Sequence, residues 1–512
     1  MLIGKRLFGL ETEYGIQIDG VGGDTDVVVE SMELIRAYLR EDFVARWDYD
    51  LENPRMDIRG FEVDELLNDI DETVHLQRDR KRKIPRAELK SDLILTNGAR
   101  LYNDHTHPEY STPECYSLRD LIASDRAGEL ILLQCGRRRT DNLDSGVVRL
   151  YKNNTDFEGH SYGCHENYLI SRALPFEHVI DGLLPFLATR QVFAGAGKVG
   201  VEGDRGAEPA VFQLAQRSDF FETIASVDTM TKRPLVNTRD EPHAEAAQFR
   251  RLHIIIGDSN MSDYVTALKV GSMLLVLYLI ESGQGPDIEL ADPLGALKSI
   301  SRDPSRRWPL ELVNGRHSDA LEVQRAYLEH ARVMATGRDE QTDWVLGEWA
   351  TMLECLGRDP DELVGRCDWV TKKWLLDAFA EAEGLDWDNP EHRIWLQSQD
   401  LEYHNVDPES GLYQILAAYN DDWRLTNEMQ ARMATQKAPP GTRAYFRGRS
   451  IEKFGDSVQA LNWDSIEFDL DGRTAVVDLK GLVDGEVAAK FNRVLDTSAT
   501  VQDLVAALES NH

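Results

Sequence analysis

Polar and apolar residues alternate along residues 96–112, and this pattern predicts a strand that runs into a tight polar turn. Successive side chains on a strand point to opposite faces, so Arg100, Tyr102 and Asp104 should share one face. Glu109 follows five residues after Asp104. A guanidinium, a phenol and two carboxylates in one place favour a site for phosphate and magnesium. The alternative is a half-exposed edge strand with a solvated polar face, which is common in antiparallel sheets.

A second strand pattern near the N-terminus places Glu11 and Glu13 on one face, roughly 7 Å apart by the strand rise. Two carboxylates that share a site repel each other unless a cation lies between them. An ordinary surface strand also explains this short pattern. Two further segments, 151–168 and 237–258, join apolar runs to His, Glu, Asn and Arg, which strengthens the metal interpretation.

From about residue 262 to 435 the apolar residues recur at helical spacing. The most apolar run, Val270–Ile280, is too short to span a bilayer, so we expect a buried helix from near Ser262 to residues 282–283. The Lys-Ala-Pro-Pro-Gly stretch at 437–441 marks a break. Beyond it we expect strands at 463–470 and 474–479 and a helix from about residue 500.

Composition indicates a soluble globular protein of 512 residues with 42% hydrophobic and 29% charged residues. Lys+Arg 57 against Asp+Glu 89 gives a net charge of −32, which argues against nucleic acid or anionic membranes as partners. The five cysteines show no framework spacing and no signal peptide is visible, so we expect reduced thiols and a cytoplasmic location.

Several longer motifs then occur in order along the chain: E-T-E-Y-G, N-G-A-R-L-Y-N-D, H-P-E-Y-S-T-P-E-C, Y-K-N-N-T-D, S-Y-G-C-H-E-N-Y-L and N-T-R-D-E-P-H-A. With these motifs the chain resembles the Pup ligase and Pup deamidase/depupylase family, which belongs with the glutamine synthetase-like carboxylate–amine ligases. The resemblance implies an α+β fold. Its large domain, residues 1–436, would be glutamine synthetase-like, with a mostly antiparallel curved sheet packed by helices. Residues 437–512 would form a small C-terminal α/β domain.

The resemblance also implies roles for individual residues, with ATP and Mg²⁺ as cofactors. Asp104 matches the catalytic aspartate, as a nucleophile or as the activator of a water. The other matches are magnesium ligands at Glu11, Tyr102, Glu109 and His243, phosphate contacts at Arg100 and Thr112, and an indole that packs near the nucleotide at Trp463. Roles for Glu13, His165, Glu166 and Asn167 are left open.

Three features resemble the cleaving member of the family: an inserted loop at about 46–92, the spacing from Asp104 to Glu109, and the segment Arg443–Gly448. We therefore expect a hydrolase that removes Pup from lysines of pupylated proteins and deamidates the C-terminal glutamine of Pup. Gly9–Glu13 and Cys164 instead resemble the ligase, which joins the C-terminal glutamate of Pup to substrate lysines.

A Pup-binding pseudo-enzyme is the third hypothesis. Pup and pupylated proteins are the expected partners, and we expect a monomer. A basic run at 78–83 in the inserted loop, followed by Arg86 and Lys90, is either a solvated loop tip or a surface that attracts Pup or a tagged substrate.

Overall fold

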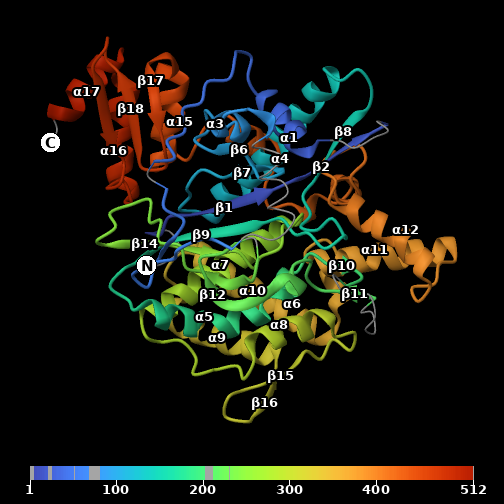
Figure 1. Ribbon diagram of the computed structural model, residues 1–512. Helices are drawn as coiled ribbons and strands as arrows, with labels where there is room; N and C mark the ends of the chain where they lie inside the picture. Colours follow the sequence, from blue (N-terminus) through green and yellow to red (C-terminus); the bar gives the residue numbers. More distant parts are fainter. Residues whose placement is uncertain are drawn as a thin grey trace.

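The computed structural model describes residues 5–20, 26–50, 52–67, 81–201, 211–229 and 231–510. Its centre is an eight-stranded sheet in the order β12-β13-β14-β9-β1-β7-β6-β5 (Figure 1). The strands are β1 Phe8–Glu13, β5 Leu93–Ile94, β6 Arg100–Asp104, β7 His107–Ser111, β9 Cys164–Ser171, β12 Phe221–Ser226, β13 Arg233–Asn237 and β14 Phe249–Ile254. Within this sheet β12 and β13 are parallel and the other neighbouring strands are antiparallel, which confirms the predicted α+β class and the mostly antiparallel sheet.

The two faces of the sheet differ in chemistry. On β1, Leu10 and Thr12 are buried, whereas Glu11 and Glu13 on the other face are partly exposed. Helices cover the apolar face: the ring of Tyr110 on β7 packs directly against Gly128 of α4. The helices of this side and its surroundings are α4 Leu118–Asp141, α5 Phe176–Thr189, α6 Gln191–Ala194, α7 Asp263–Glu281, α8 Pro293–Arg302, α9 Ala320–Ala335 and α10 Glu340–Arg358.

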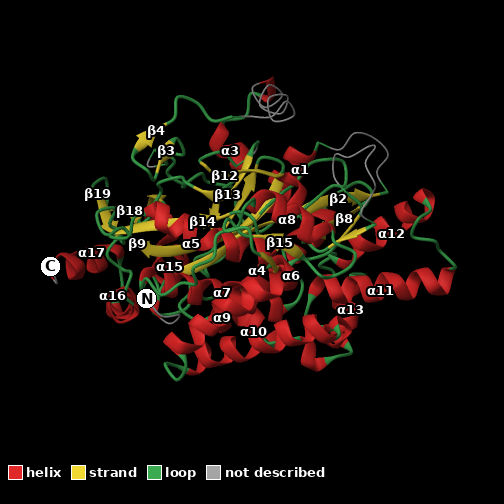
Figure 2. Cartoon of the chain, turned by 90° about the horizontal axis from the view of Figure 1, so that it is seen from below, coloured by secondary structure: helices red, strands yellow, loops and turns green. Residues whose placement is uncertain are grey.

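Helix α7 confirms the predicted buried helix. The Ser262 side chain caps its N-terminus by accepting a hydrogen bond from the Val265 amide. By length and composition α7 is apolar enough to cross a membrane, but 89% of its apolar window is buried inside the protein. It packs among α5, α9 and α10, so its hydrophobicity serves the core (Figures 1 and 2).

The remaining helical region extends the same layer. It contains α11 Asp368–Glu383, α12 Pro390–Tyr403, α13 Leu412–Ala418 and α14 Glu428–Ala434. Short two-stranded sheets decorate the periphery: β2 Gly15–Asp19 with β8 Val147–Tyr151, β10 Lys198–Val199 with β11 Phe212–Gln213, and β15 Pro309–Glu311 with β16 His317–Asp319.

The predicted inserted loop lies on the opposite side of the molecule from α7, α9 and α10 (Figure 2). Its described parts include β3 Met56–Asp57, β4 Phe61–Glu62 and α3 Arg86–Lys90, and α3 contacts the preceding helix α1, Val27–Arg36. The Ile58 amide donates to the Thr238 carbonyl oxygen at 2.7 Å, which ties the segment to the end of β13. Residues 78–80 of the basic run lie outside the described residues.

The C-terminal unit follows the predicted break (Figure 1, red). It contains α15 Arg443–Phe454, β17 Val458–Leu461, β18 Ser465–Asp469, β19 Thr474–Asp478, α16 Gly485–Thr497 and α17 Val501–Ser510. The strands confirm the expected strands at 463–470 and 474–479, and α17 confirms the helix from about residue 500. Sequence reasoning missed α16. The unit has its own apolar cluster, built around Phe446, Ile466 and Phe468.

Candidate functional site

Three carboxylates meet on the polar face of the sheet. The residues are Glu13, Asp104 and Glu109, and one ligand oxygen from each lies within 4.8 Å of the others. Strand register brings them together, because Glu13 of β1 pairs with Glu109 of β7, and Asp104 ends β6 in the tight hairpin to His107. The structure therefore places the predicted catalytic aspartate beside Glu109, with Glu13 as the third member.

A second group lies one strand away. Glu11 of β1 pairs with His165 of β9, and His253 of β14 lies behind them, so that ligand atoms of all three fall within 4.8 Å. The His253 ring is buried, and within the described part of the chain neither of its nitrogens has a hydrogen-bond partner. Its Nε2 lies 3.6 Å from Glu11 Oε2, too far for a hydrogen bond, and a buried imidazole that makes no hydrogen bond is unfavourable unless a ligand completes it.

In the group of Glu13, Asp104 and Glu109, burial and neighbouring charges shift the pKa values of the carboxyl groups. Burial and the neighbouring carboxylates of Asp104, Glu11 and Glu13 raise the pKa of Glu109 well above its ordinary value. Burial also opposes ionisation of Asp104, but the charges of Lys90 and His105 outweigh it and hold the pKa of Asp104 well below its ordinary value. Asp104 is thus a carboxylate anion at neutral pH, next to an acid that resists ionisation.

The donor sets fit divalent cations. Mg²⁺ prefers oxygen ligands, so Glu13, Asp104 and Glu109 form the group that suits it best. A cation there would relieve the repulsion that raises the pKa of Glu109. The second group offers one carboxylate and two imidazoles, a mixed set that also suits a divalent metal.

The structure does not bring the four predicted magnesium ligands, Glu11, Tyr102, Glu109 and His243, into one group. Glu109 and Glu11 belong to separate groups, and Tyr102 donates its hydroxyl hydrogen bond to Glu109 Oε1 at 2.7 Å. The His243 ring lies near the indole ring of Trp463, with 6.2 Å between the ring centroids. Metal roles for Tyr102 and His243 stay predictions.

Sequence reasoning assigned no role to Glu13, His165 or His253. The shared face of Glu11 and Glu13 was a signal for the first of these. His165 and His253 stand in the polar clusters noted in the sequence, but only the register between β1, β9 and β14 shows that they converge on Glu11.

A cleft between the sheet and the C-terminal unit holds the other predicted residues. Its lining includes Thr112, His243, Trp463, Arg251 and Arg443. Two guanidinium groups and an indole suit a ligand that carries both phosphates and a flat ring, as a nucleotide does. Glu11 also lines this cleft, so the cleft reaches the group that Glu11 forms with His165 and His253.

Arg100 occupies a different setting from the expected phosphate contact. Its guanidinium lies between the rings of Trp47 and Tyr102, at 3.8 and 3.9 Å from their centroids. Its Nε donates to Asp92 Oδ1 at 2.6 Å. The phosphate role of Arg100 stays a prediction, and in this state Asp92 and Glu52 supply its anionic partners.

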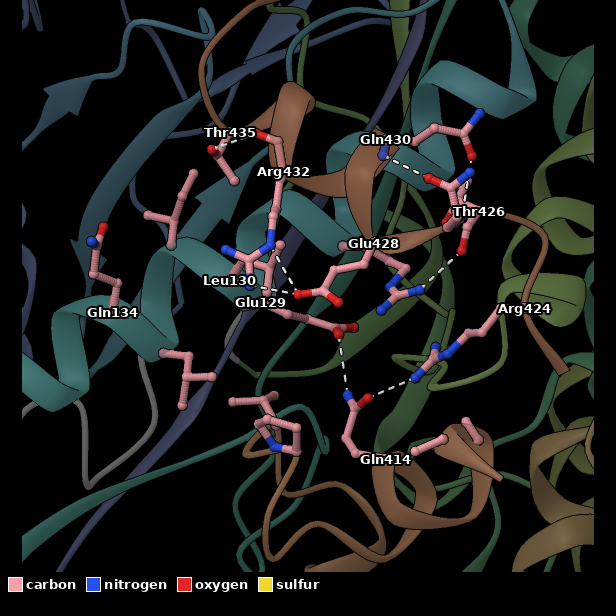
Figure 3. A pocket seen from close by; sticks show the side chains of 18 of the residues that line it. Glu129, Leu130, Gln134, Gln414, Arg424, Thr426, Glu428, Gln430, Arg432 and Thr435 are labelled. Carbon is pink, nitrogen blue, oxygen red and sulfur yellow. Dashed lines mark hydrogen bonds and ion pairs between the residues drawn. The ribbon is translucent and has the colours of Figure 1, made fainter. Parts of the chain in front are cut away.

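A larger cavity, of about 1360 Å³, lies elsewhere, between α4 and the segment that carries α13 and α14 (Figure 3). Polar and charged side chains in its wall form hydrogen bonds with one another: Gln414 donates to Glu129 at 3.3 Å and accepts from Arg424 at 2.6 Å. None of the predicted site residues lines it, so cavity size alone would have pointed away from the carboxylate site.

Comparison with known proteins places this chain in a family. The family model described as Pup-ligase protein matches residues 6–467, and the chain belongs to that family. It is 43% identical to a protein named depupylase from Acidothermus cellulolyticus, over 98% of this chain and 99% of the relative. It is 41% identical to the Pup deamidase/depupylase of Mycolicibacterium smegmatis, over 92% of this chain and 93% of the relative.

Two solved structures share the fold. One is the complex between the prokaryotic ubiquitin-like protein Pup and its ligase PafA, with a TM-score of 0.76 and 30% identity over 99% of this chain and 95% of that chain. The other is PafA in complex with ADP, with a TM-score of 0.71 and 34% identity over 85% of this chain and 97% of that chain.

Proposed function

We propose that this protein is a hydrolase of the Pup pathway. It removes Pup from lysine side chains of pupylated proteins and deamidates a C-terminal glutamine of Pup, with ATP and Mg²⁺ as cofactors, in the cytoplasm. The observation that carries the proposal is the ionised Asp104 carboxylate beside Glu13 and Glu109, on the sheet whose neighbouring cleft is lined by Glu11, Thr112 and Trp463. Relatives named for depupylase and deamidase activity match nearly the full length of the chain.

The chemistry is cleavage of a C–N bond. A Mg²⁺ bound together with the nucleotide phosphates would polarise the glutamyl side-chain carbonyl. Asp104 either attacks the carbonyl carbon, so that the C–N bond breaks as an Asp104–glutamyl anhydride forms and a water then hydrolyses that anhydride, or it deprotonates a water that attacks the carbon directly. On both routes one water is consumed across the C–N bond, and the nitrogen leaves with a proton as ammonia or as the lysine amine. The lowered pKa of Asp104 keeps it ionised, which is the form that both routes need.

The chain's own residues prepare this carboxylate. Lys90 donates to Asp104 Oδ1 at 2.6 Å, and His105 Nδ1 lies 3.1 Å from Oδ2. Glu13 and Glu109 would hold the metal, and Tyr102 fixes the orientation of Glu109 through its hydrogen bond. Thr112, Arg443 and Trp463 would hold the nucleotide in the cleft.

Ligation is the second candidate function, favoured by the resemblance to two PafA structures and by the match to the Pup-ligase family. One assay separates the two. The purified protein is incubated with ATP, Mg²⁺ and a Pup-conjugated substrate, and the products are resolved by intact-protein mass spectrometry. Release of Pup and of unmodified substrate supports hydrolysis. Formation of new conjugates from glutamate-ended Pup, with consumption of ATP, supports ligation. If neither occurs, both proposals fail.

A further inference from the structure

Lys90, which none of the family motifs contains, lies directly on the reacting carboxylate. Its Nζ is 2.6 Å from Asp104 Oδ1, and the two side chains are only 19% and 25% exposed. We propose that Lys90 is a positioning residue that keeps the Asp104 carboxylate from joining Glu13 and Glu109 as a third metal ligand and so reserves it for the reaction. This inference rests on the proposed function, because that function makes Asp104 the reacting group.

The backbone around Lys90 is fixed on both sides. Arg36 donates to the Glu88 carbonyl and to the Ser91 hydroxyl, both at 2.9 Å. The Asn103 side chain, on the strand that carries Asp104, donates to the Leu89 carbonyl at 3.1 Å. The Arg36 bonds anchor the end of α3 to α1 and the Asn103 bond anchors it to β6, so the lysine reaches Asp104 from a fixed backbone position.

The segment that joins α3 to β5 explains the match between charges. β5 pairs antiparallel with β6, with Leu93 opposite Leu101 and Ile94 opposite Arg100. Lys90 ends α3, and Ser91 after it has a positive φ of 48°, so Lys90 reaches Asp104 from the helix end and not through a strand pair. The same short segment supplies Asp92, which binds Arg100 at 2.6 Å. Lys90 therefore pairs with Asp104 of β6, and Asp92 pairs with Arg100 of the same strand.

Electrostatics show what the lysine does for the carboxylate group. Three carboxylates within 4.8 Å would all draw toward one divalent cation, and a carboxylate bound to metal is a poor nucleophile. An ammonium on Asp104 competes with the metal for that carboxylate and, as a like charge, opposes a third metal ligand there. Glu13 and Glu109 have no comparable lysine among the described ion pairs, where Glu13 pairs with His107. The group is therefore divided into two metal ligands and one reacting carboxylate.

The test compares Lys90→Met, which keeps the length of the side chain and removes its charge, with Lys90→Arg, which keeps the charge. Lys81→Met is the matched control, because Lys81 is an exposed lysine of the same inserted segment. The first readout is the Mn²⁺ dissociation constant, measured by titration calorimetry without nucleotide or Pup. We expect Lys90→Met to bind Mn²⁺ about fivefold to tenfold more tightly, because Asp104 joins the ligands, and Lys90→Arg and Lys81→Met to match the parent within about twofold.

The second readout is steady-state cleavage of a Pup conjugate. Lys90→Met should lower kcat by about tenfold or more with KM changed by less than about twofold, and Lys90→Arg should restore most of kcat. In an Asp104→Asn background, Lys90→Met should no longer tighten Mn²⁺ binding. Unchanged or weaker Mn²⁺ binding in a natively folded Lys90→Met protein would overturn the inference. The Mn²⁺ readout needs no Pup, so it stands apart from any failure of the proposed function.

Discussion

Among single residues, Asp104 and Glu109 differ in charge: Asp104 is ionised, whereas Glu109 resists ionisation. They lie within one group of ligand atoms, yet their pKa values move in opposite directions. Burial acts on both. Asp104 has Lys90 and His105 beside it, whereas Glu109 faces other carboxylates and, among the described residues, accepts a hydrogen bond from the Tyr102 hydroxyl. A pair of carboxyl groups driven apart in this way is typical of an active site.

Glu109 gives a prediction about metal-linked stability. Because its pKa is raised in the folded protein, its protonated form contributes stability below the unfolded pKa, near 4.5, that is lost as pH rises through the folded pKa. At pH 8 the metal-free Glu109→Gln protein should therefore melt at a higher temperature than the parent. Mg²⁺ should raise the Tm of the parent by about 3 °C or more and leave the variant within about 1 °C. Differential scanning calorimetry with EDTA or Mg²⁺ measures both effects; an equal Mg²⁺ response in the two proteins would remove Glu109 from the metal site.

At the scale of elements, the site depends on contacts between strands and on the docking of α15. Glu114, which follows β7, accepts from Arg443 at 2.6 Å and from Arg447 at 2.5 Å. Burial alone would raise the pKa of Glu114, but the two guanidinium groups lower it to about 2. Arg447 also donates to the Trp463 carbonyl at 2.9 Å. The Glu114 carboxylate therefore links the end of β7, through Arg443 and Arg447, to the C-terminal unit that contains Trp463.

Removal of that carboxylate should loosen the C-terminal unit. In Glu114→Ala, Arg447 is left buried without its anion, and we expect the free energy of unfolding to fall by about 3 kcal/mol. Nucleotide binding should weaken as well, because Arg443 and Trp463 line the cleft. Glu452→Ala, which breaks the surface pair with Arg449, is the control and should change stability by less than about 1 kcal/mol. Urea unfolding and titration with a fluorescent ATP analogue give the two numbers. Equal effects of the two substitutions would contradict the coupling.

Sequence patterns predicted elements better than they predicted encounters between elements. Period-two alternation predicted β6, and the cap at Ser262 with the apolar run predicted α7, because both signals are local. The convergence of Glu11 with His165 and His253 depends on strand register across more than 150 residues, which no local pattern contains. The family motifs predicted Asp104 and Glu109, whereas Lys90 lies outside every motif, and the sequence noted it only as a basic residue of the inserted loop; its contact with Asp104 came from the structure.

At the scale of the whole molecule, a net charge of −32 coexists with a core that buries many charged groups. One such group joins α11 to the end of α12: Lys372 lies against Asp400 and 2.8 Å from His404 Nε2, and all three side chains are fully buried. Burial and the charge of Lys372 lower the pKa of His404 well below its ordinary value. The fold therefore holds this histidine neutral.

This arrangement predicts acid sensitivity. A histidine whose pKa is lowered in the folded state contributes stability above the unfolded pKa, near 6.5, that is lost as pH falls below it. His243 and His253, whose pKa values are also lowered, act in the same direction. Between pH 6.5 and 5 the free energy of unfolding should fall, and His404→Gln should reduce the slope by up to about 1.4 kcal/mol per pH unit. Urea unfolding at several pH values tests this; an unchanged slope in the variant would show that His404 does not bind a proton on unfolding.

The central claim is that Asp104 performs the cleavage while its neighbours hold the cofactors. The most direct measurement compares the parent with Asp104→Asn on one Pup-conjugated protein, following free Pup by mass spectrometry and conjugate binding by fluorescence anisotropy. We expect Asp104→Asn to lower turnover by a factor of about 10³ or more and to change binding of the conjugate by less than about threefold. Release of Pup by Asp104→Asn at a rate near that of the parent would contradict it.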